Sequence, residues 1–208
     1  MARSAIWPST LQHADLTLRP IRYRDAKEFL EVRRRNSAWL APWEATSPVA
    51  GERPATFYDM VRQLNRQAAS ATALPYILTL REDGEERLIG QVTVSTIMWG
   101  SARSASIGYW ISEDVAGRGL MPTAVALATD HCFRGLNLHR VEINIRPENA
   151  PSLAVVRKLG FRDEGLRKKF LHIDGKWTDH RTFALLEDEV PEGVLSRYLA
   201  QRESTSER

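Results

Sequence analysis

The chain of 208 residues is 43% hydrophobic and 26% charged, a balance typical of a globular protein with a sizeable core. Its formal net charge is +3 and its pI about 9.2, which suits an anionic ligand but falls short of a dedicated nucleic-acid binder. The single cysteine, Cys132, excludes an internal disulfide and fits a reducing compartment. No apolar run approaches the roughly 18 residues of a membrane span, and the N-terminus lacks an apolar signal region. We therefore expect a cytoplasmic protein without membrane contact.

At this length a single domain over 1–208 is the simplest organisation. We expect its core to span about 16–187, after a loose N-terminal arm. Leu16 to Ile21 alternates in polarity and predicts a strand. Asp25 and Glu28 have the spacing of a capping box, and the apolar stripe that follows predicts a helix.

The next segment, 37–54, is rich in Trp and Pro and is expected to be a loop. Residues 56–67 carry apolar side chains at helical spacing and predict a second helix. Three strands are then expected over 76–81, 88–96 and 105–112, with a turn at Asp83-Gly84.

A further helix should carry Pro122 in its first turn, bury Cys132 on its apolar face and stop at Gly135. The remaining segments predict a strand over 140–146, a helix over 152–159, a hairpin around Asp174-Gly175 with strands over 169–173 and 177–185, and a helix over 190–199. The last residues, from Arg202 to Arg208, are polar and expected to fray. This order implies an α/β fold with helices on both faces of one sheet.

The most informative motif is the loop Gly117-Arg118-Gly119, which follows a predicted strand and precedes a predicted helix. Two glycines allow a sharp turn, so that several backbone N–H groups face one point. The free N–H groups of the following helix add to this arrangement. The loop is therefore predicted to bind a phosphate or diphosphate.

Other chemistries lack their motifs. The chain contains no Gly-x4-Gly-Lys-Ser/Thr run of an NTPase, no Gly-x-Gly-x-x-Gly fingerprint of a dinucleotide fold and no Gly-x-Ser-x-Gly elbow. Its five histidines and one cysteine show no metal-ligand spacing, and no metal is expected.

Several motifs in this order resemble the GNAT family of acetyl-CoA-dependent N-acetyltransferases: Gly117 to Met121, Asn149-x-x-Ser152, and Lys158-Leu159-Gly160-Phe161. Three further stretches resemble the branch of RimJ/RimL-like ribosomal-protein alanine N-acetyltransferases. They are 36–44 (NSAWLAPWE), His139-Arg140 and 171–180 (LHIDGKWTDH). The resemblance covers roughly residues 16–187.

The resemblance implies a mixed, mainly antiparallel central sheet flanked by helices, with a splayed strand pair at the cofactor site. It implies direct transfer of an acetyl group from acetyl-CoA to a protein N-terminal amine, with a ribosomal protein alanine as acceptor. Two alternatives stay open: a small-amine acetyltransferase acting on a polyamine, antibiotic or amino acid, and a non-catalytic acyl-CoA-binding module. We expect a monomer or homodimer that does not bind nucleic acid directly.

The resemblance also assigns cofactor contacts. Backbone groups of the predicted strand would bind the pantetheine arm, and the loop with the first helical turn would hold the diphosphate, where Pro122 contributes only shape. Asn149 would bond a pantetheine amide or simply cap its helix. These cofactor-binding residues are Tyr109, Trp110, Ile111, Gly117, Arg118, Gly119, Leu120, Met121, Pro122, Asn149 and Ser152.

Two catalytic candidates follow. Many family members have a tyrosine, as acid for the leaving thiolate, at the position of Val156, so Ser152 becomes the candidate for stabilising or protonating the thiolate. Glu142 lies on the face of its predicted strand that Asn144 shares, and is the candidate proton acceptor for the amine. Its alternative is a pairing role with a neighbour such as Arg140. The oxyanion would meet a backbone N–H near Ile111.

Acceptor contacts are predicted in the aromatic loop, at Trp39, Trp43 and Glu44. Loops this aromatic often line sites, and the branch resemblance points the same way. The alternative is a local hydrophobic clasp that has no contact with the acceptor.

Overall fold

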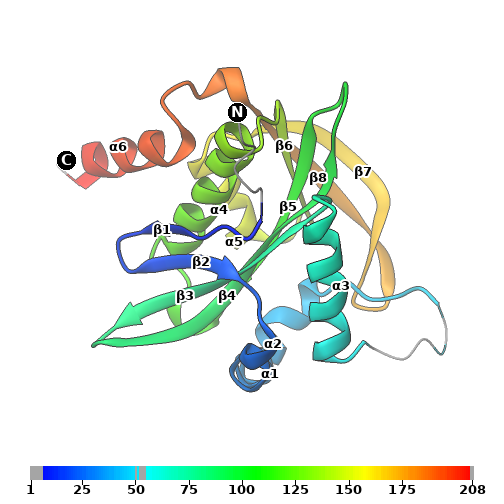
Figure 1. The fold of residues 1–208 in the computed structure, drawn as a ribbon. Helices are drawn as coiled ribbons and strands as arrows, with labels where there is room; N and C mark the ends of the chain where they lie inside the picture. The colour runs from blue at the N-terminus through cyan, green and yellow to red at the C-terminus, as the bar shows by residue number, and fades with distance from the viewer. Residues whose placement is uncertain (1–6, 50, 52–54, 207–208) are drawn as a thin grey trace.

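A computed structural model describes residues 7–49, 51 and 55–206, and within them one sheet carries helices on both faces (Figure 1). The eight strands are β1 (Leu11–His13), β2 (Leu16–Pro20), β3 (Leu74–Glu82), β4 (Glu85–Met98), β5 (Ser104–Ile111), β6 (Arg140–Ile145), β7 (Arg162–Ile173) and β8 (Lys176–Leu186). Their order in the sheet is β1-β2-β3-β4-β5-β6-β8-β7. Neighbours pair antiparallel except β5 and β6, which are parallel. The mixed, mainly antiparallel sheet is thus confirmed.

The α-helices are α1 (Ala26–Arg35), α2 (Ser37–Leu40), α3 (Phe57–Ala69), α4 (Leu120–Asp130), α5 (Ala150–Lys158) and α6 (Val194–Ser206). Short helical turns are η1 (Tyr23–Asp25), η2 (Ala41–Trp43), η3 (Glu113–Val115), the π-helical η4 (His131–Gly135) and η5 (Glu187–Glu189).

Two apolar cores lie on opposite faces of the sheet because side chains alternate along a strand. In β3, Tyr76 and Leu78 belong to the larger core under α4, α5 and α6. Ile77 faces the smaller core, together with Phe29 of α1 and Val61 of α3. The predicted covering of both sheet faces by helices is therefore present (Figure 1).

The feature that positions the site is the divergence of β5 from β6. The two strands pair only where Ser104–Ser106 faces Arg140–Glu142. Beyond this point, β5 continues to Ile111 and β6 to Ile145, and the two strands no longer pair with each other. The expected splayed pair is thus present, and it leaves one edge of β5 open.

The prediction of a loose N-terminal arm is wrong from residue 7 onward; residues 1–6 lie outside the described part. The ring of Trp7 packs edge-on against Tyr76 with centroids 5.1 Å apart. The Ser9 hydroxyl hydrogen-bonds the Tyr76 hydroxyl at 2.6 Å, and β1 pairs with β2. The sequence pattern missed these contacts because the partner, Tyr76, is far along the chain.

The predicted capping box at Asp25 is also wrong. The Asp25 carboxylate accepts two hydrogen bonds from Arg19 at 3.0 Å and one from the Arg22 backbone N–H at 2.7 Å. The Glu28 carboxylate instead accepts the backbone N–H of Leu88 in β4. A charged bidentate partner is stronger than a cap, so it captures the aspartate.

Other boundaries differ more modestly. The expected loop 37–54 contains α2 and η2, while residues 50 and 52–54 lie outside the described part. Helix α5 begins at Ala150. Strand β7 begins at Arg162, where its pairing with β8 starts, and ion pairs such as Arg181–Asp163 also join its exposed early residues to β8. Helix α6 starts after the expected residue 190 and continues to Ser206, so the expected fraying from Arg202 is wrong up to that point; residues 207–208 are not described.

Candidate functional site

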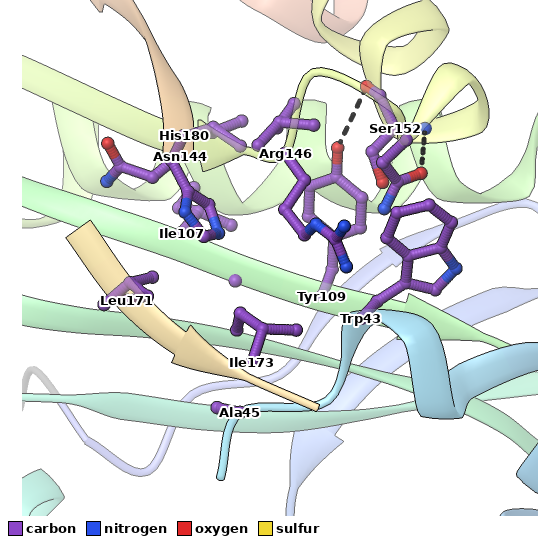
Figure 2. A pocket seen from close by; sticks show the side chains of 14 residues that line it. Trp43, Ala45, Ile107, Tyr109, Asn144, Arg146, Ser152, Leu171, Ile173 and His180 are labelled. Carbon is purple, nitrogen blue, oxygen red and sulfur yellow. Dashed lines mark hydrogen bonds between the residues drawn. The ribbon is translucent and has the colours of Figure 1, made fainter. Parts of the chain in front are cut away.

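A cavity of about 220 Å³ lies where β5 and β6 diverge. Its wall comes from both strands, the start of α5, the end of η2 and the β7–β8 hairpin (Figure 2). The lining residues are Trp43, Ala45, Ile107, Gly108, Tyr109, Ile143, Asn144, Ile145, Arg146, Asn149, Ser152, Leu171, Ile173 and His180. Of the predicted site residues, the structure thus brings Trp43, Tyr109, Asn149 and Ser152 together.

One wall of the cavity is the first turn of α5. The Asn149 side-chain oxygen caps this helix by accepting the Ser152 backbone N–H at 3.1 Å. The Tyr109 hydroxyl donates to the Ser152 backbone carbonyl at 3.3 Å, which ties α5 to β5 (Figure 2). Burial raises the pKa of the Tyr109 phenol, so it stays protonated at neutral pH. The backbone of Ser152 is thereby fixed, and its hydroxyl carries no assigned bond in the described part of the chain.

The glycine loop has the conformation that its sequence predicts. Gly117 and Gly119 have φ of +81° and +84°, in the left-handed region that favours glycine. Among the described residues, no acceptor is assigned to the backbone N–H groups of Gly117, Arg118 or Gly119, and α4 begins directly after them at Leu120. These donors at a helix N-terminus suit a diphosphate.

Two side chains of α6 lie close to this loop. A Cβ atom at Gly119 would lie 3.1 Å from the Tyr198 hydroxyl and 3.2 Å from an Arg202 guanidinium nitrogen, both from α6. The Arg118 guanidinium is paired with Glu82 at 2.6 Å. A Cβ atom at position 119 would therefore displace the ends of the Tyr198 and Arg202 side chains slightly, in a backbone conformation that already favours glycine.

The buried side chain of Asn36 supports the segment before the glycine loop. In the sequence, Asn36 was named only as part of the motif 36–44. The Asn36 amide donates to the Val32 carbonyl and the Ser112 hydroxyl, both at 2.8 Å. Its oxygen accepts the Glu113 backbone N–H at 2.8 Å. Asn36 thus holds the connection between β5 and the glycine loop, a role that required tertiary contacts to see.

The end of β5 is also fixed by Trp39 of α2. The Trp39 indole N–H donates to the Ile111 carbonyl at 3.1 Å, and Trp39 does not line the cavity. The Trp110 side chain lies in the smaller core beside Phe29, at a centroid distance of 5.8 Å. The Trp110 side chain is thus outside the cavity wall, and the binding of the pantetheine arm by backbone groups of this strand stays a prediction.

Trp43 also lines the cavity, and its indole lies near Ser152 (Figure 2). The Arg146 guanidinium lies 5.4 Å from the Trp43 ring centroid and donates to the Pro42 carbonyl at 2.6 Å. The Glu44 carboxylate is not part of the cavity wall and pairs with Arg33. Trp43 and Glu44 are adjacent in sequence, but only the indole reaches the cavity.

Glu142 has the pairing role that was its alternative. Its carboxylate accepts hydrogen bonds from Arg140 at 2.8 Å and from Arg167 at 3.3 Å, and it is not part of the cavity wall. Arg140 also binds Glu164, so three residues of two strands join Glu142 in one ion-pair network. The Arg167 contact comes from β7, which the local sequence around Glu142 does not reveal.

His180 lines the cavity, and in the sequence it was named only as the last residue of the motif 171–180. It is 3% exposed, and one ring nitrogen, Nδ1, lies 3.2 Å from the Thr178 carbonyl. Burial lowers its pKa below the ordinary value of 6.5. Next to it, the Asn144 amide oxygen accepts the Thr182 hydroxyl at 2.8 Å. A buried neutral imidazole is thus part of the wall (Figure 2).

Two residues have core roles. Val156, at the position where many family members have tyrosine, is fully buried. Cys132 is buried as predicted, and burial raises the pKa of its thiol to about 12. Within 7–49, 51 and 55–206, no cluster of metal-ligating side chains is found, and no helix is long and apolar enough to cross a membrane.

Comparisons with known proteins agree with this geometry. Residues 15–162 match the acetyltransferase (GNAT) domain family. The probable N-acetyltransferase YjcK of Bacillus subtilis (strain 168) is 31% identical over 180 residues, which is 85% of this chain and 96% of that protein. The [ribosomal protein uS5]-alanine N-acetyltransferase of Escherichia coli (strain K12) is 30% identical over 170 residues, which is 82% of this chain and 87% of that protein.

A solved structure, Mycobacterium smegmatis RimJ in complex with CoA-disulfide, superposes with a TM-score of 0.85 at 36% identity. The superposition covers 94% of this chain and 96% of that one. The family match, the splayed strands and the glycine loop agree on one assignment. The chain is a member of the GNAT family, an acetyltransferase whose co-substrate is acetyl-CoA.

Proposed function

We propose that the protein transfers acetyl to the α-amino group at a protein N-terminus, with an N-terminal alanine of a ribosomal protein as the acceptor. The observation that carries this proposal is the charge of the cavity. Its wall, as described, contains the cation Arg146 and no carboxylate. Similarity to the E. coli uS5-alanine enzyme across most of both chains supports the same acceptor class.

The charge of the cavity wall distinguishes between the classes of acceptor. A polyamine carries several ammonium groups, and a site for it needs carboxylates to offset their desolvation. Arg146 is itself paired with Glu148 at 3.3 Å and offers such a ligand no attraction, and the two carboxylates considered from the sequence, Glu44 and Glu142, are already paired with arginines. An N-terminal α-amino group has a pKa of about 7.7–8.0, so a usable fraction is neutral at pH 7. The cavity therefore suits a single, easily neutralised amine.

The apolar part of the wall favours small groups. Ile107, Ile143 and Ile173 surround the space between the splayed strands. An acetyl methyl group and the methyl side chain of alanine both fit such a lining, while a long charged side chain would lose its hydration there. The indole of Trp43 is proposed as the wall that the acceptor backbone contacts.

The cofactor contacts are proposed as follows. Acetyl-CoA supplies an activated acetyl thioester, whose leaving thiolate has a pKa near 8.5. The free N–H groups of Gly117, Arg118 and Gly119 would bind its diphosphate together with the α4 N-terminus, where Leu120 and Met121 add free N–H groups and Pro122 adds shape. The open edge of β5, from Tyr109 to Ile111, would align the pantetheine arm as an added strand does.

At the reacting end, two residues at the start of α5 act together. The Asn149 oxygen is committed to the helix cap, which leaves its amide N–H groups to donate to a pantetheine carbonyl. The Ser152 hydroxyl would hydrogen-bond the sulfur as the carbon–sulfur bond breaks. A backbone N–H on the open edge of β5 would stabilise the developing oxyanion. The Asn149 side chain and the Ser152 backbone are held in place by hydrogen bonds before the acceptor arrives.

The proposal is tested by comparing acceptors under one set of conditions. Steady-state rates would be measured with acetyl-CoA and either a peptide bearing an N-terminal alanine or spermidine. We expect kcat/KM for the peptide to exceed that for spermidine by at least about 100-fold, the size of one unfavourable buried charge. Spermidine turnover alone would show a small-amine enzyme, and tight acetyl-CoA binding without turnover would show a binding module.

A further inference from the structure

His180 stands apart from the other groups of the cavity wall. It is fixed on β8, whose neighbouring strands are β6 and β7, and its side chain is almost fully buried. Its ring lies edge-on to Phe170 of β7, with centroids 6.1 Å apart. Figure 2 shows the imidazole between Asn144 of β6 and Ile107 of β5, the two strands that diverge. The ring is thus held on the inside of the site by packing.

The hydrogen bond of the ring defines which nitrogen carries the proton. A carbonyl oxygen only accepts, so the Nδ1 atom that contacts the Thr178 carbonyl at 3.2 Å must be the donor. In a neutral imidazole the other nitrogen, Nε2, is then an acceptor with a free lone pair. The hydrogen bond to the Thr178 carbonyl therefore leaves Nε2 of His180 able to act as a base at the cavity wall.

The other titratable groups of the wall are unsuited to this role. Arg146 cannot accept a proton, because a guanidinium presents only N–H donors. The Tyr109 hydroxyl donates to the Ser152 carbonyl and remains protonated. The Glu142 carboxylate, the candidate from sequence, is bound by Arg140 and Arg167 outside the cavity wall.

We propose that Nε2 of His180 accepts the proton that the acceptor amine releases, directly or through one water, when the amine attacks the acetyl carbonyl. This inference rests on the acetyl transfer to an amine proposed above and identifies the residue that accepts the proton. The Thr178 carbonyl would stabilise the resulting imidazolium through Nδ1–H, as the orienting group of a catalytic base does.

The step balances in atoms and charge. The amine nitrogen donates its electron pair to the carbonyl carbon and forms the carbon–nitrogen bond, and its surplus proton moves to His180 Nε2. The carbon–sulfur bond breaks, and the thiolate leaves with that electron pair, stabilised by the Ser152 hydroxyl. The imidazolium then returns its proton to the thiolate or to water. No oxidant or further co-reactant is needed.

Charges on the neighbouring elements adjust the basicity of His180. Burial is the main cause that lowers its pKa, and Arg146 at the end of β6 lowers it further. Glu148, which follows β6, and Asp179, on β8 itself, raise it, as does the Thr178 carbonyl. Arg167 on β7 pairs in register with His180, but its guanidinium stacks over Phe170 and binds Glu142. The balance keeps the imidazole neutral and able to accept a proton at pH 7.

The first test compares His180→Gln with His139→Gln, the same change at an exposed histidine outside the cavity. With the N-terminal alanine peptide, we expect His180→Gln to lower kcat/KM about 100-fold at pH 7, a loss typical of a positioned base. The loss should shrink toward pH 9, where the amine is already neutral, while CoA affinity stays unchanged. A pH profile parallel to that of wild type, or a comparable pH-dependent loss in Glu142→Gln but not in His180→Gln, would overturn the proposal.

A second measurement uses the wild-type protein and does not depend on turnover. Long-range proton–nitrogen correlation spectra of the histidine rings report the tautomer and pKa of each. We expect the His180 ring to be the neutral Nδ1–H tautomer at pH 7.5, with a pKa below 6.5. An imidazolium or an Nε2–H tautomer at His180 would contradict the inference. If wild type acetylates only spermidine, the acceptor proposal fails, whereas the same His180→Gln comparison on spermidine still decides the role of His180.

Discussion

The side-chain oxygen of Asn149 accepts the backbone N–H of Ser152 at 3.1 Å, so one hydrogen bond fixes both the start of α5 and the reacting end of the site. Structural and functional roles of Asn149 can therefore be separated by substitution. Aspartate keeps a capping oxygen and loses the amide donor, while alanine loses both. The pair of variants measures the two roles independently.

We expect Asn149→Asp to keep the thermal stability of wild type and to weaken CoA affinity about 10-fold, because a donor is replaced by a negative charge. Asn149→Ala should weaken CoA affinity similarly and also lower stability by about 1 kcal/mol, the usual loss of a helix cap. Calorimetric titration and thermal unfolding give both quantities. Unchanged CoA affinity in Asn149→Asp would restrict Asn149 to capping.

Removing the Ser152 hydroxyl leaves its two backbone hydrogen bonds intact. Ser152→Ala should therefore fold and bind CoA as wild type does, and kcat should fall roughly 10- to 100-fold through loss of one donor to the thiolate. Single-turnover rates and CoA titration test this prediction. A wild-type kcat would remove Ser152 from the chemical step.

Alanine at Gly119 would place a Cβ 3.1 Å from the Tyr198 hydroxyl, in a backbone conformation that favours glycine. We expect Gly119→Ala to weaken CoA affinity at least about 10-fold, because the Cβ strains the positive-φ backbone of the proposed diphosphate loop and displaces the neighbouring Tyr198 and Arg202 side chains. Gly84→Ala is the matched control, since Gly84 also has positive φ, +83°, but a Cβ atom there would meet no heavy atom within 4 Å. If both variants lose stability equally and retain CoA affinity, the loop does not bind the diphosphate.

Two neighbours test the acceptor side. Trp43 lines the cavity, whereas Glu44 pairs with Arg33 outside its wall. Trp43→Ala should raise KM for the alanine peptide about 10-fold with little change in CoA affinity, and Glu44→Ala should change KM by less than about threefold. Equal effects of the two variants on peptide KM would contradict this placement of the acceptor.

Acid stability depends on the network around Glu142. The Arg140 guanidinium lowers the pKa of the Glu164 carboxyl to about 2, with Arg162 contributing. Its folded pKa is below the unfolded value, so its stabilising contribution is complete above about pH 4.5 and is lost as pH falls toward 2. Glu164→Gln should lower the urea midpoint at pH 7 and flatten its decline between these values. Glu203→Gln, at an exposed site on α6, should retain the wild-type decline.

Local patterns predicted the parts of the site that depend on neighbouring residues. The positive φ of Gly117 and Gly119 and the cap at Asn149 are set within a few residues, so the spacing of the motif is enough to identify them. From β2 onward, the order of the strands and of the longer helices followed from periodicity for the same reason, whereas β1 and the four-residue α2 were missed.

Side-chain roles that depend on distant strands could not be read this way. Glu142 lies at the last position where β6 pairs with β5, and its contact with Arg167 of β7 comes from 25 positions later in the chain. His180 gains its place because β5, β6 and β8 meet at the cavity, and a motif gives no information about which side of β8 faces it. The ordered start of the chain likewise depends on Tyr76.

The most direct test of the account is to locate the transferred acetyl group by tandem mass spectrometry. The substrate is a peptide with an N-terminal alanine and one internal lysine, incubated with purified protein and acetyl-CoA. The account predicts a single acetyl group on the alanine α-nitrogen, with the lysine unmodified and release of one CoA per acetylated peptide. Acetylation of the lysine alone, or acetylation of spermidine but not of the peptide, would contradict it.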